Sequence, residues 1–138
     1  MKQKAVPDTS FLTEHFRKGT VQDSFIDLTR HYHIAFSSVV LMELLSGAYE
    51  PKERRLIDQI RRTFTVLTVS ERQWYICGDI MMKLRKDKKV YPVRVRSLLA
   101  DILIAVSACD VGAVLITKNK KDFKLIKDVF DFKYLAVE

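Results

Sequence analysis

The sequence predicts a single domain of the α/β class, with a mainly parallel central sheet and helices packed against it. Short apolar stretches that suit strands alternate along the chain with longer stretches whose apolar residues recur at helical spacing. The chain has 138 residues, the size of one domain, and contains no repeat or linker-like tract. Its 48% hydrophobic and 30% charged residues are the balance of an ordinary folded protein. Residues 1–138 are therefore expected to form one domain.

The first third of the chain predicts a strand, two helices and a second strand. Residues 5–6 suit a short strand, and residues 11–16 then place apolar side chains at helical spacing until Gly19 ends the helix. The helical pattern returns over residues 21–28. The brief run 33–36 predicts the second strand.

The middle of the chain predicts two more helices and a third strand. The serine pair 37–38 offers an N-cap to the helix 39–46, and a glycine follows as its C-terminal stop. A proline suits the first turn of the charged helix 51–62. Residues 64–69 alternate apolar residues with threonine, as a strand does.

The rest of the chain completes the alternation. Ser70 caps a helix whose apolar stripe runs from Cys77 to Leu84. The remaining predicted elements are a basic connector at 85–96, a helix at 97–110, and strands at 113–117 and 134–137. In sheets of this kind, ligands bind at the carboxyl ends of the strands.

The charge balance points to a polyanionic partner. The chain has 24 Lys and Arg against 17 Asp and Glu, a formal net charge of +7, so nucleic acid is the first candidate. A lysine-rich surface that only aids solubility is the alternative. The longest apolar stretch, 102–116, is interrupted by Ser107 and Asp110 and falls short of the ~18 residues of a membrane span. No secretory signal develops before Pro7, so we expect a cytoplasmic protein that does not enter the membrane.

The cysteines and aromatic residues are expected in the core. Cys77 and Cys109 lie in helical apolar patterns without Cys-x-x-Cys spacing, which predicts buried thiols rather than a disulfide or a zinc site. Trp74, Tyr75 and the phenylalanines are expected to be buried too, because no aromatic ladder suggests base stacking.

Two carboxylates occupy positions where helical spacing predicts a packed, apolar face. The neighbours of Asp101 at i−3 and i+3 are Leu98 and Ile104, and an unpaired carboxylate among such residues is costly. Glu43 presents the same anomaly within the apolar run 39–45.

Two further carboxylates follow predicted strands: Asp8 after the first, and Asp122 a few residues beyond Thr117. Taken singly, Asp8 and Asp122 can be helix N-caps, and Glu43 and Asp101 can pair with buried arginines. Taken together, they suggest one cleft, because a divalent cation such as Mg²⁺ or Mn²⁺ satisfies several carboxylates at once. This arrangement is typical of metal-dependent nucleases.

Four short blocks match those of a known family, in the family's order and over nearly the whole chain. They are Asp8-Thr9-Ser10, Met42-Glu43-Leu44-Leu45-Ser46-Gly47, Asp101-Ile102-Leu103-Ile104-Ala105 and Thr117-Lys118-Asn119-Lys120-Lys121-Asp122-Phe123. The chain resembles PIN-domain ribonucleases, in particular VapC-like toxins of type II toxin–antitoxin pairs. This resemblance implies a PIN-like three-layer α/β/α sandwich.

The resemblance also implies an Mg²⁺- or Mn²⁺-dependent endoribonuclease, usually a homodimer and usually held inactive by a small antitoxin. Asp8, Glu43 and Asp101 match the family's metal-binding, catalytic acids. The fourth acid falls at Asn119 or Asp122, and we favour Asp122, with Thr117 and Asn119 as supporting polar groups. Two alternatives remain open: a PIN nuclease of RNA processing, and a catalytically silent PIN module that binds RNA or protein.

Basic residues on either side of the proposed acids are candidates for binding the RNA substrate, which the acids themselves would repel. The expected RNA-binding residues are Arg85, Lys86, Lys88, Lys89, Arg94, Arg96, Lys118, Lys120 and Lys121. A solvated lysine face is the alternative.

Overall fold

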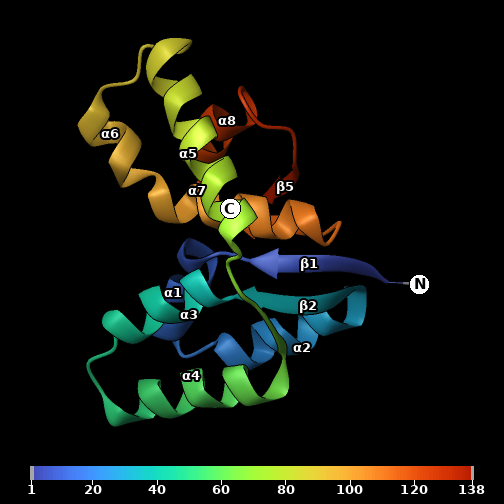
Figure 1. The fold of residues 1–138 in the computed structure, drawn as a ribbon. Helices are drawn as coiled ribbons and strands as arrows, with labels where there is room; N and C mark the ends of the chain where they lie inside the picture. The colour runs from blue at the N-terminus through green and yellow to red at the C-terminus, as the bar shows by residue number, and fades with distance from the viewer. Residues whose placement is uncertain (1, 138) are drawn as a thin grey trace.

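The computed structural model describes residues 2–137, which form five strands and eight helices (Figure 1). In chain order these are β1 (Gln3–Pro7), α1 (Thr9–Lys18), α2 (Val21–His31), β2 (Tyr32–Ser37), α3 (Ser38–Ser46), α4 (Pro51–Thr63), β3 (Thr65–Leu67), α5 (Glu71–Lys86), α6 (Pro92–Ser97), α7 (Leu99–Asp110), β4 (Val114–Thr117), α8 (Lys120–Lys127) and β5 (Lys133–Ala136). The predicted α/β class is confirmed.

The five strands form one sheet in the order β3-β2-β1-β4-β5, and every neighbouring pair is parallel. The chain moves outward from β1 to β2 and β3, and then returns to the other side of β1 as β4 and β5. Pro7 at the end of β1 pairs with Ile116 near the end of β4. This reversal places a topological switch point at the carboxyl ends of β1 and β4, where open parallel sheets bind ligands.

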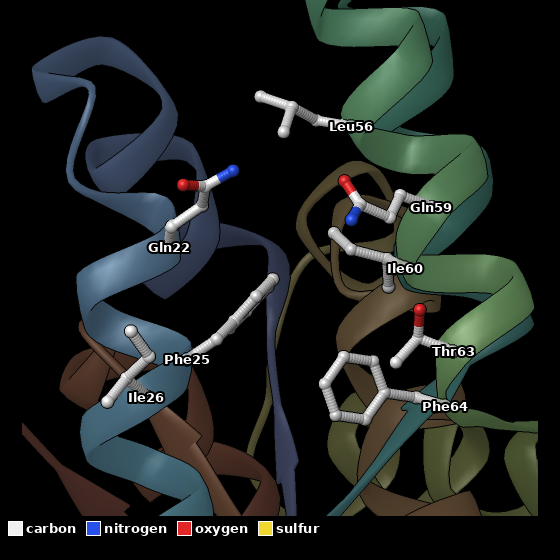
Figure 2. Close-up of a pocket in the computed structure, with 8 residues that line it drawn as sticks. All are labelled: Gln22, Phe25, Ile26, Leu56, Gln59, Ile60, Thr63 and Phe64. Atoms are coloured by element: carbon white, nitrogen blue, oxygen red, sulfur yellow. The ribbon is translucent and has the colours of Figure 1, made fainter.

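An apolar groove lies between α2 and α4, away from the switch point. Its volume is about 310 Å³, and Phe25 and Ile26 on α2 line it together with Ile60 and Phe64 on and just after α4. Figure 2 shows these side chains on the two helices that border the groove.

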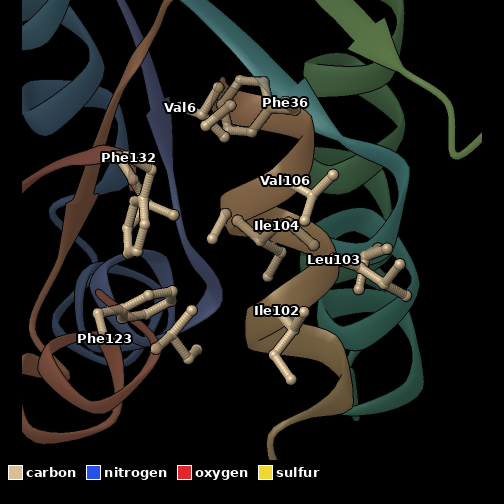
Figure 3. Packing of buried hydrophobic residues seen from close by; sticks show 14 of the residues in the cluster. Val6, Phe36, Ile102, Leu103, Ile104, Val106, Phe123 and Phe132 are labelled. Carbon is tan, nitrogen blue, oxygen red and sulfur yellow. The ribbon is translucent and has the colours of Figure 1, made fainter. Parts of the chain in front are cut away.

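The buried hydrophobic residues form one connected cluster, in which α7 packs against β2 and β4 of the sheet. Val6 of β1 and Phe36 of β2 are fully buried and lie beside α7 (Figure 3). The whole segment 102–108 of α7 is buried as well. Phe36 also meets Phe25 edge-on at a ring-centroid distance of 5.8 Å, which ties α2 to the sheet. Close packing of this kind holds α7, and any polar group on it, in a defined place.

The structure differs from the sequence prediction in the basic connector. Helix α5 continues to Lys86 and α6 begins at Pro92, so only residues 87–91 are a loop. A proline's fixed φ suits the first turn of a helix, which explains where α6 begins. The predicted helix 97–110 is in fact α7 alone, because Leu98 separates it from α6. Helix α8 was considered only as a helix that Asp122 could cap, and that alternative is wrong, because Asn119 is at the N-cap position and Asp122 lies in the first turn.

Three side chains that the sequence placed in the core are exposed: Cys109, Trp74 and Tyr75. Trp74 and Tyr75 are 52% and 78% exposed on α5, whose buried stripe instead includes Cys77 and Ile80. An amphipathic helix turns by about 100° per residue, so apolar residues beside its buried stripe face solvent. Within residues 2–137, no helix is long and apolar enough to cross a membrane.

Candidate active site

Asp8 stands at the switch point, directly after β1, and caps helix α1. It is 2% exposed, and its Oδ1 accepts a hydrogen bond from the backbone N–H of Phe11 at 3.0 Å. The hydroxyls of Thr117 and Ser10 donate to the same carboxylate at 2.6 and 2.8 Å. Burial raises the pKa of Asp8 above its ordinary value, although these hydrogen bonds oppose the increase. Asp8 therefore caps α1 and also places a buried carboxylate at the switch point.

Hydroxyl groups tie the ends of β1 and β4 together around Asp8. Thr117 is fully buried, and its Oγ1 accepts a hydrogen bond from the backbone N–H of Asn119 at 2.8 Å. Ser10 Oγ accepts a hydrogen bond from the backbone N–H of Lys118 at 3.1 Å. Thr117 thus supports Asp8 directly. Ser10 was not predicted as a site residue. The signal that could have identified it is its position two residues after the N-cap Asp8, from which its hydroxyl reaches the Asp8 carboxylate.

Glu43 comes from α3, the helix that follows β2. Its Oε1 accepts a hydrogen bond from the hydroxyl of Thr9 at 2.6 Å, which links α3 to the first turn of α1. Thr9 is a second hydroxyl residue that sequence reasoning did not place in the site. Glu43 is partly buried and also lines a groove of about 620 Å³ bordered by α1, α3 and α4.

Asp101, in the first turn of α7, is partly buried beside the other acids. Burial raises its pKa to about 7, and the charges of Asp8, Asp122 and Glu43 contribute in that order. Arg94 opposes the increase. Among the described residues, neither Asp101 nor Glu43 forms an ion pair with an arginine, so the alternative that each pairs with its own buried arginine is wrong. The charges of the other three predicted acids instead all act on Asp101.

Asp122, on α8, differs from the other three acids because it already has a cationic partner. Arg94 of α6 donates to its Oδ1, and the Asn119 amide donates to its Oδ2 at 2.8 Å. Burial alone would raise the pKa of Asp122, but these two hydrogen bonds and the positive charges of Arg94 and Lys121 together hold its pKa below the ordinary value. Asn119 therefore supports Asp122, and also caps α8 by position.

The donor chemistry of these acids fits a hard divalent cation. Mg²⁺ and Mn²⁺ prefer carboxylate oxygens, and a cation would offset both the burial of the Asp101 carboxylate and the repulsion from neighbouring acids, which together raise its pKa. Over residues 2–137, however, no three His, Cys, Asp or Glu side chains are arranged closely enough to hold one ion. The acids are gathered but do not form a complete set of ligands as they stand.

The predicted RNA-binding residues divide into exposed and engaged groups. Those that are exposed to solvent are Arg85, Lys86, Lys88, Lys89, Arg96, Lys120 and Lys121. Lys88 forms an ion pair with Asp128 at 3.4 Å. Lys118 and Arg94 are partly buried and pair with Glu14 and Asp122. Most of the basic surface is therefore accessible, whereas Arg94 belongs to the acidic site itself.

Comparison with known proteins adds a family and a fold. The family model described as "PIN domain" matches residues 5–129. Ribonuclease VapC1 of Methanocaldococcus jannaschii is 25% identical over 130 residues, which cover 92% of this chain and 84% of that protein. A chain in the DNA-bound VapBC2 structure from Rickettsia felis has a TM-score of 0.73 at 20% identity and covers 97% of this chain and 98% of its own. A chain of DNA-bound VapBC from Salmonella typhimurium has a TM-score of 0.71 at 22% identity, with the same coverage.

The raised pKa of Asp101 predicts a pH-dependent stability. Because the folded protein holds this proton up to a pH of about 7, Asp101 lowers the free energy of unfolding as the pH rises from 3.8 toward 7. Asp101→Asn removes the ionisation. The free energy of unfolding of the variant should therefore exceed that of the wild type by on the order of 2 kcal/mol at pH 8 and by little at pH 4. Urea unfolding at both pH values measures this difference. The matched change Asp27→Asn, at an exposed position of α2, should have little effect at either pH, and an equal response of the two variants would contradict the prediction.

Proposed function

The chain belongs to the PIN-domain family, and from this premise we propose that it is a metal-dependent endoribonuclease, the toxin of a toxin–antitoxin pair. The ribonuclease name of its M. jannaschii relative and the VapBC complexes among its structural neighbours support this proposal. The observation that carries it is that Asp8 after β1, Glu43 on α3 and Asp101 on α7 are brought together by the fold, with the pKa of Asp101 raised to about 7 by burial and by the charges of the other acids. A buried carboxylate kept among like charges is costly for stability and suits a site that receives a cation.

The proposed ligands for Mg²⁺ or Mn²⁺ are Asp8, Glu43, Asp101 and Asp122. When bound, the cation supplies Lewis-acid catalysis: it polarises a phosphate oxygen and lowers the pKa of a water that attacks phosphorus. Thr117 and Ser10 orient the Asp8 carboxylate, and Thr9 orients that of Glu43. The exposed basic residues of α5, α6 and α8 supply contacts to the RNA backbone, which hold the strand without reading its sequence.

Asp101→Asn tests the catalytic site. The substitution preserves shape and removes one anionic ligand, so RNA cleavage in Mg²⁺ or Mn²⁺ should fall roughly a hundredfold or more while the protein stays folded. Gel analysis of a labelled RNA measures the loss, and wild-type products are expected to carry 5′-phosphate and 3′-hydroxyl ends. Asp27→Asn is the control and should keep wild-type activity. Cleavage that persists in excess EDTA, or full activity in folded Asp101→Asn, would contradict the proposal.

The apolar groove between α2 and α4 is the proposed site of the antitoxin (Figure 2). Gln22 and Leu56 line both this groove and the larger one that contains Glu43, so the two grooves adjoin. A small partner whose apolar side chains fill the first groove could therefore reach the acids along the second. There an Arg or Lys of the partner would pair with the carboxylates, Asp8 and Asp101 included, and exclude the cation.

Ile26→Asp separates antitoxin binding from catalysis. Ile26 is 55% exposed in the groove, and a carboxylate there should weaken binding of the protein encoded by the adjacent gene about thirtyfold. RNA cleavage by the free variant should be unchanged, because Ile26 is not among the acids or the predicted RNA-binding residues. Titration calorimetry measures the affinity, with Tyr75→Asp, at an exposed position of α5, as the control. A partner that binds both variants equally would contradict this groove as its site, and a nuclease that no neighbouring product suppresses would contradict the toxin role.

We also propose that the free protein is a homodimer. Met42 and Leu45 lie one turn apart on α3 and are 56% and 41% exposed, which supports an apolar contact through this early helix. Light scattering on the purified chain should give twice the 16.1 kDa of one copy. A mass of one copy at micromolar concentration would contradict the dimer.

A further inference from the structure

Arg94 occupies an unusual position, because it is a cation of this chain already placed within the acidic site. Its guanidinium donates through Nη2 to Asp122 Oδ1 and through Nη1 to Ser97 Oγ at 3.3 Å. The side chains of Arg94 and Asp122 are 38% and 19% exposed, so the pair lies at the edge of the site rather than in the core. The Asn119 amide donates a hydrogen bond to the other oxygen of Asp122. Both oxygens of the fourth acid are therefore occupied by donors of the protein.

The charges of the site explain why this pair matters. Asp122 is neutralised by Arg94, whereas Asp8, Glu43 and Asp101 have hydroxyl or backbone donors or neighbouring charges but no ion pair among the described side chains. Arg94 is also close enough for its charge to act on Asp101. A divalent cation that enters the site must therefore compete with Arg94 for Asp122.

We propose that Arg94 is a tethered competitor of the divalent cation: it holds Asp122 while the site is free of metal, and it turns to an RNA phosphate when the cation takes Asp122. This inference rests on the proposed function. Because the same guanidinium cannot hold Asp122 and a phosphate with the same N–H groups, cation binding releases a phosphate-binding group beside the acids. Cation and RNA binding then favour each other.

The surroundings of Arg94 suit this exchange. Helix α6 has six residues and follows the exposed loop 87–91, and it is anchored by Val95, which is 4% exposed. Arg94 can therefore reorient by side-chain rotation while Val95 keeps the helix in place. Arg96, on the same helix, lines the groove between α5 and α6 together with Arg85. A released Arg94 would lie on a helix that already presents Arg96 to solvent.

Two roles of Arg94, positioning Asp122 and competing with the cation, predict opposite effects on cation affinity when Arg94 is removed. If Arg94 only oriented Asp122 as a ligand, its removal would weaken cation binding. If Arg94 competes with the cation, its removal frees Asp122 and leaves the site more negative, so both effects strengthen cation binding. The direction of the change therefore decides between the two roles.

Titration of the metal-free protein with Mn²⁺, in the absence of RNA, tests the proposal. Arg94→Ala should bind Mn²⁺ about fivefold more tightly than the wild type, the gain expected from removing a partly exposed ion pair and its charge. Arg94→Lys keeps the charge but lacks the planar fork of the guanidinium, so its Mn²⁺ affinity should lie between those of the wild type and Arg94→Ala. Arg96→Ala is the matched control, since it removes the same charge from the same helix at an exposed position, and it should stay within twofold of the wild type. Circular dichroism checks that each variant is folded.

RNA binding in EDTA gives a second measurement that does not depend on cleavage. With the cation removed, Arg94 stays on Asp122, so Arg94→Ala should bind a short single-stranded RNA no more weakly than Arg96→Ala does. Fluorescence anisotropy measures both affinities. A markedly weaker Arg94→Ala in EDTA would show that Arg94 is already free for RNA, and would overturn the proposal.

The outcomes separate this inference from the proposed function. A wild-type protein that binds no Mn²⁺, or whose Mn²⁺ binding is unaffected by Asp101→Asn, would contradict the metal-dependent nuclease itself. A wild-type protein that binds Mn²⁺ through Asp101, combined with equal or weaker binding by both Arg94→Ala and Arg94→Lys, would overturn the competition alone.

Discussion

Repulsion among carboxylates gathered beside the ends of β1 and β4 is the constraint on which the rest of the site depends. The groups that offset this repulsion differ from one acid to the next. Asp8 is stabilised by the donors of its own helix cap and by Thr117, and Glu43 by the hydroxyl of Thr9. Asp122 has the guanidinium of Arg94. Within residues 2–137, Asp101 has no such partner, and burial together with the charges of the other three acids raises its pKa to about 7.

The apolar core prevents the acids from moving apart. Asp101 belongs to a helix whose following residues, 102–108, are all buried against the sheet and its neighbours. Asp8 is held by the pairing of β1 with β4, since its backbone N–H donates to the carbonyl of Ile116 at 2.9 Å. Close-packed interiors resist small displacements, so hydrophobic packing here maintains an unfavourable concentration of charge. Burial of apolar side chains such as Phe36 and Leu115 offsets the free-energy cost of gathering the carboxylates.

In the function proposed above, three kinds of cation compete for the acids of the site, each by its own approach. Arg94 reaches Asp122 from α6, within the chain. A divalent ion would draw on the carboxylates around Asp101. A partner's basic side chain would come along the groove that contains Glu43, which adjoins the apolar groove between α2 and α4. If all three act on one set of negative charges, binding of any one of them would weaken binding of the others, which would give a physical basis for control of the site.

The sequence by itself determined the α/β alternation and the parallel sheet, and it singled out the four acids as candidates, because each leaves a local signal. Strands and helices differ in apolar period, and Asp101 and Glu43 stand out because they interrupt an apolar face. Only the tertiary structure decided which groups surround those acids. Arg94 and Asp122 are 28 residues apart, and Thr9 and Glu43 are 34 apart, so no spacing along the chain predicts that they meet. Those contacts follow from how α1, α3, α6 and α8 pack around the ends of β1 and β4, because an ion pair or hydrogen bond forms only where packing brings both partners within about 3 Å.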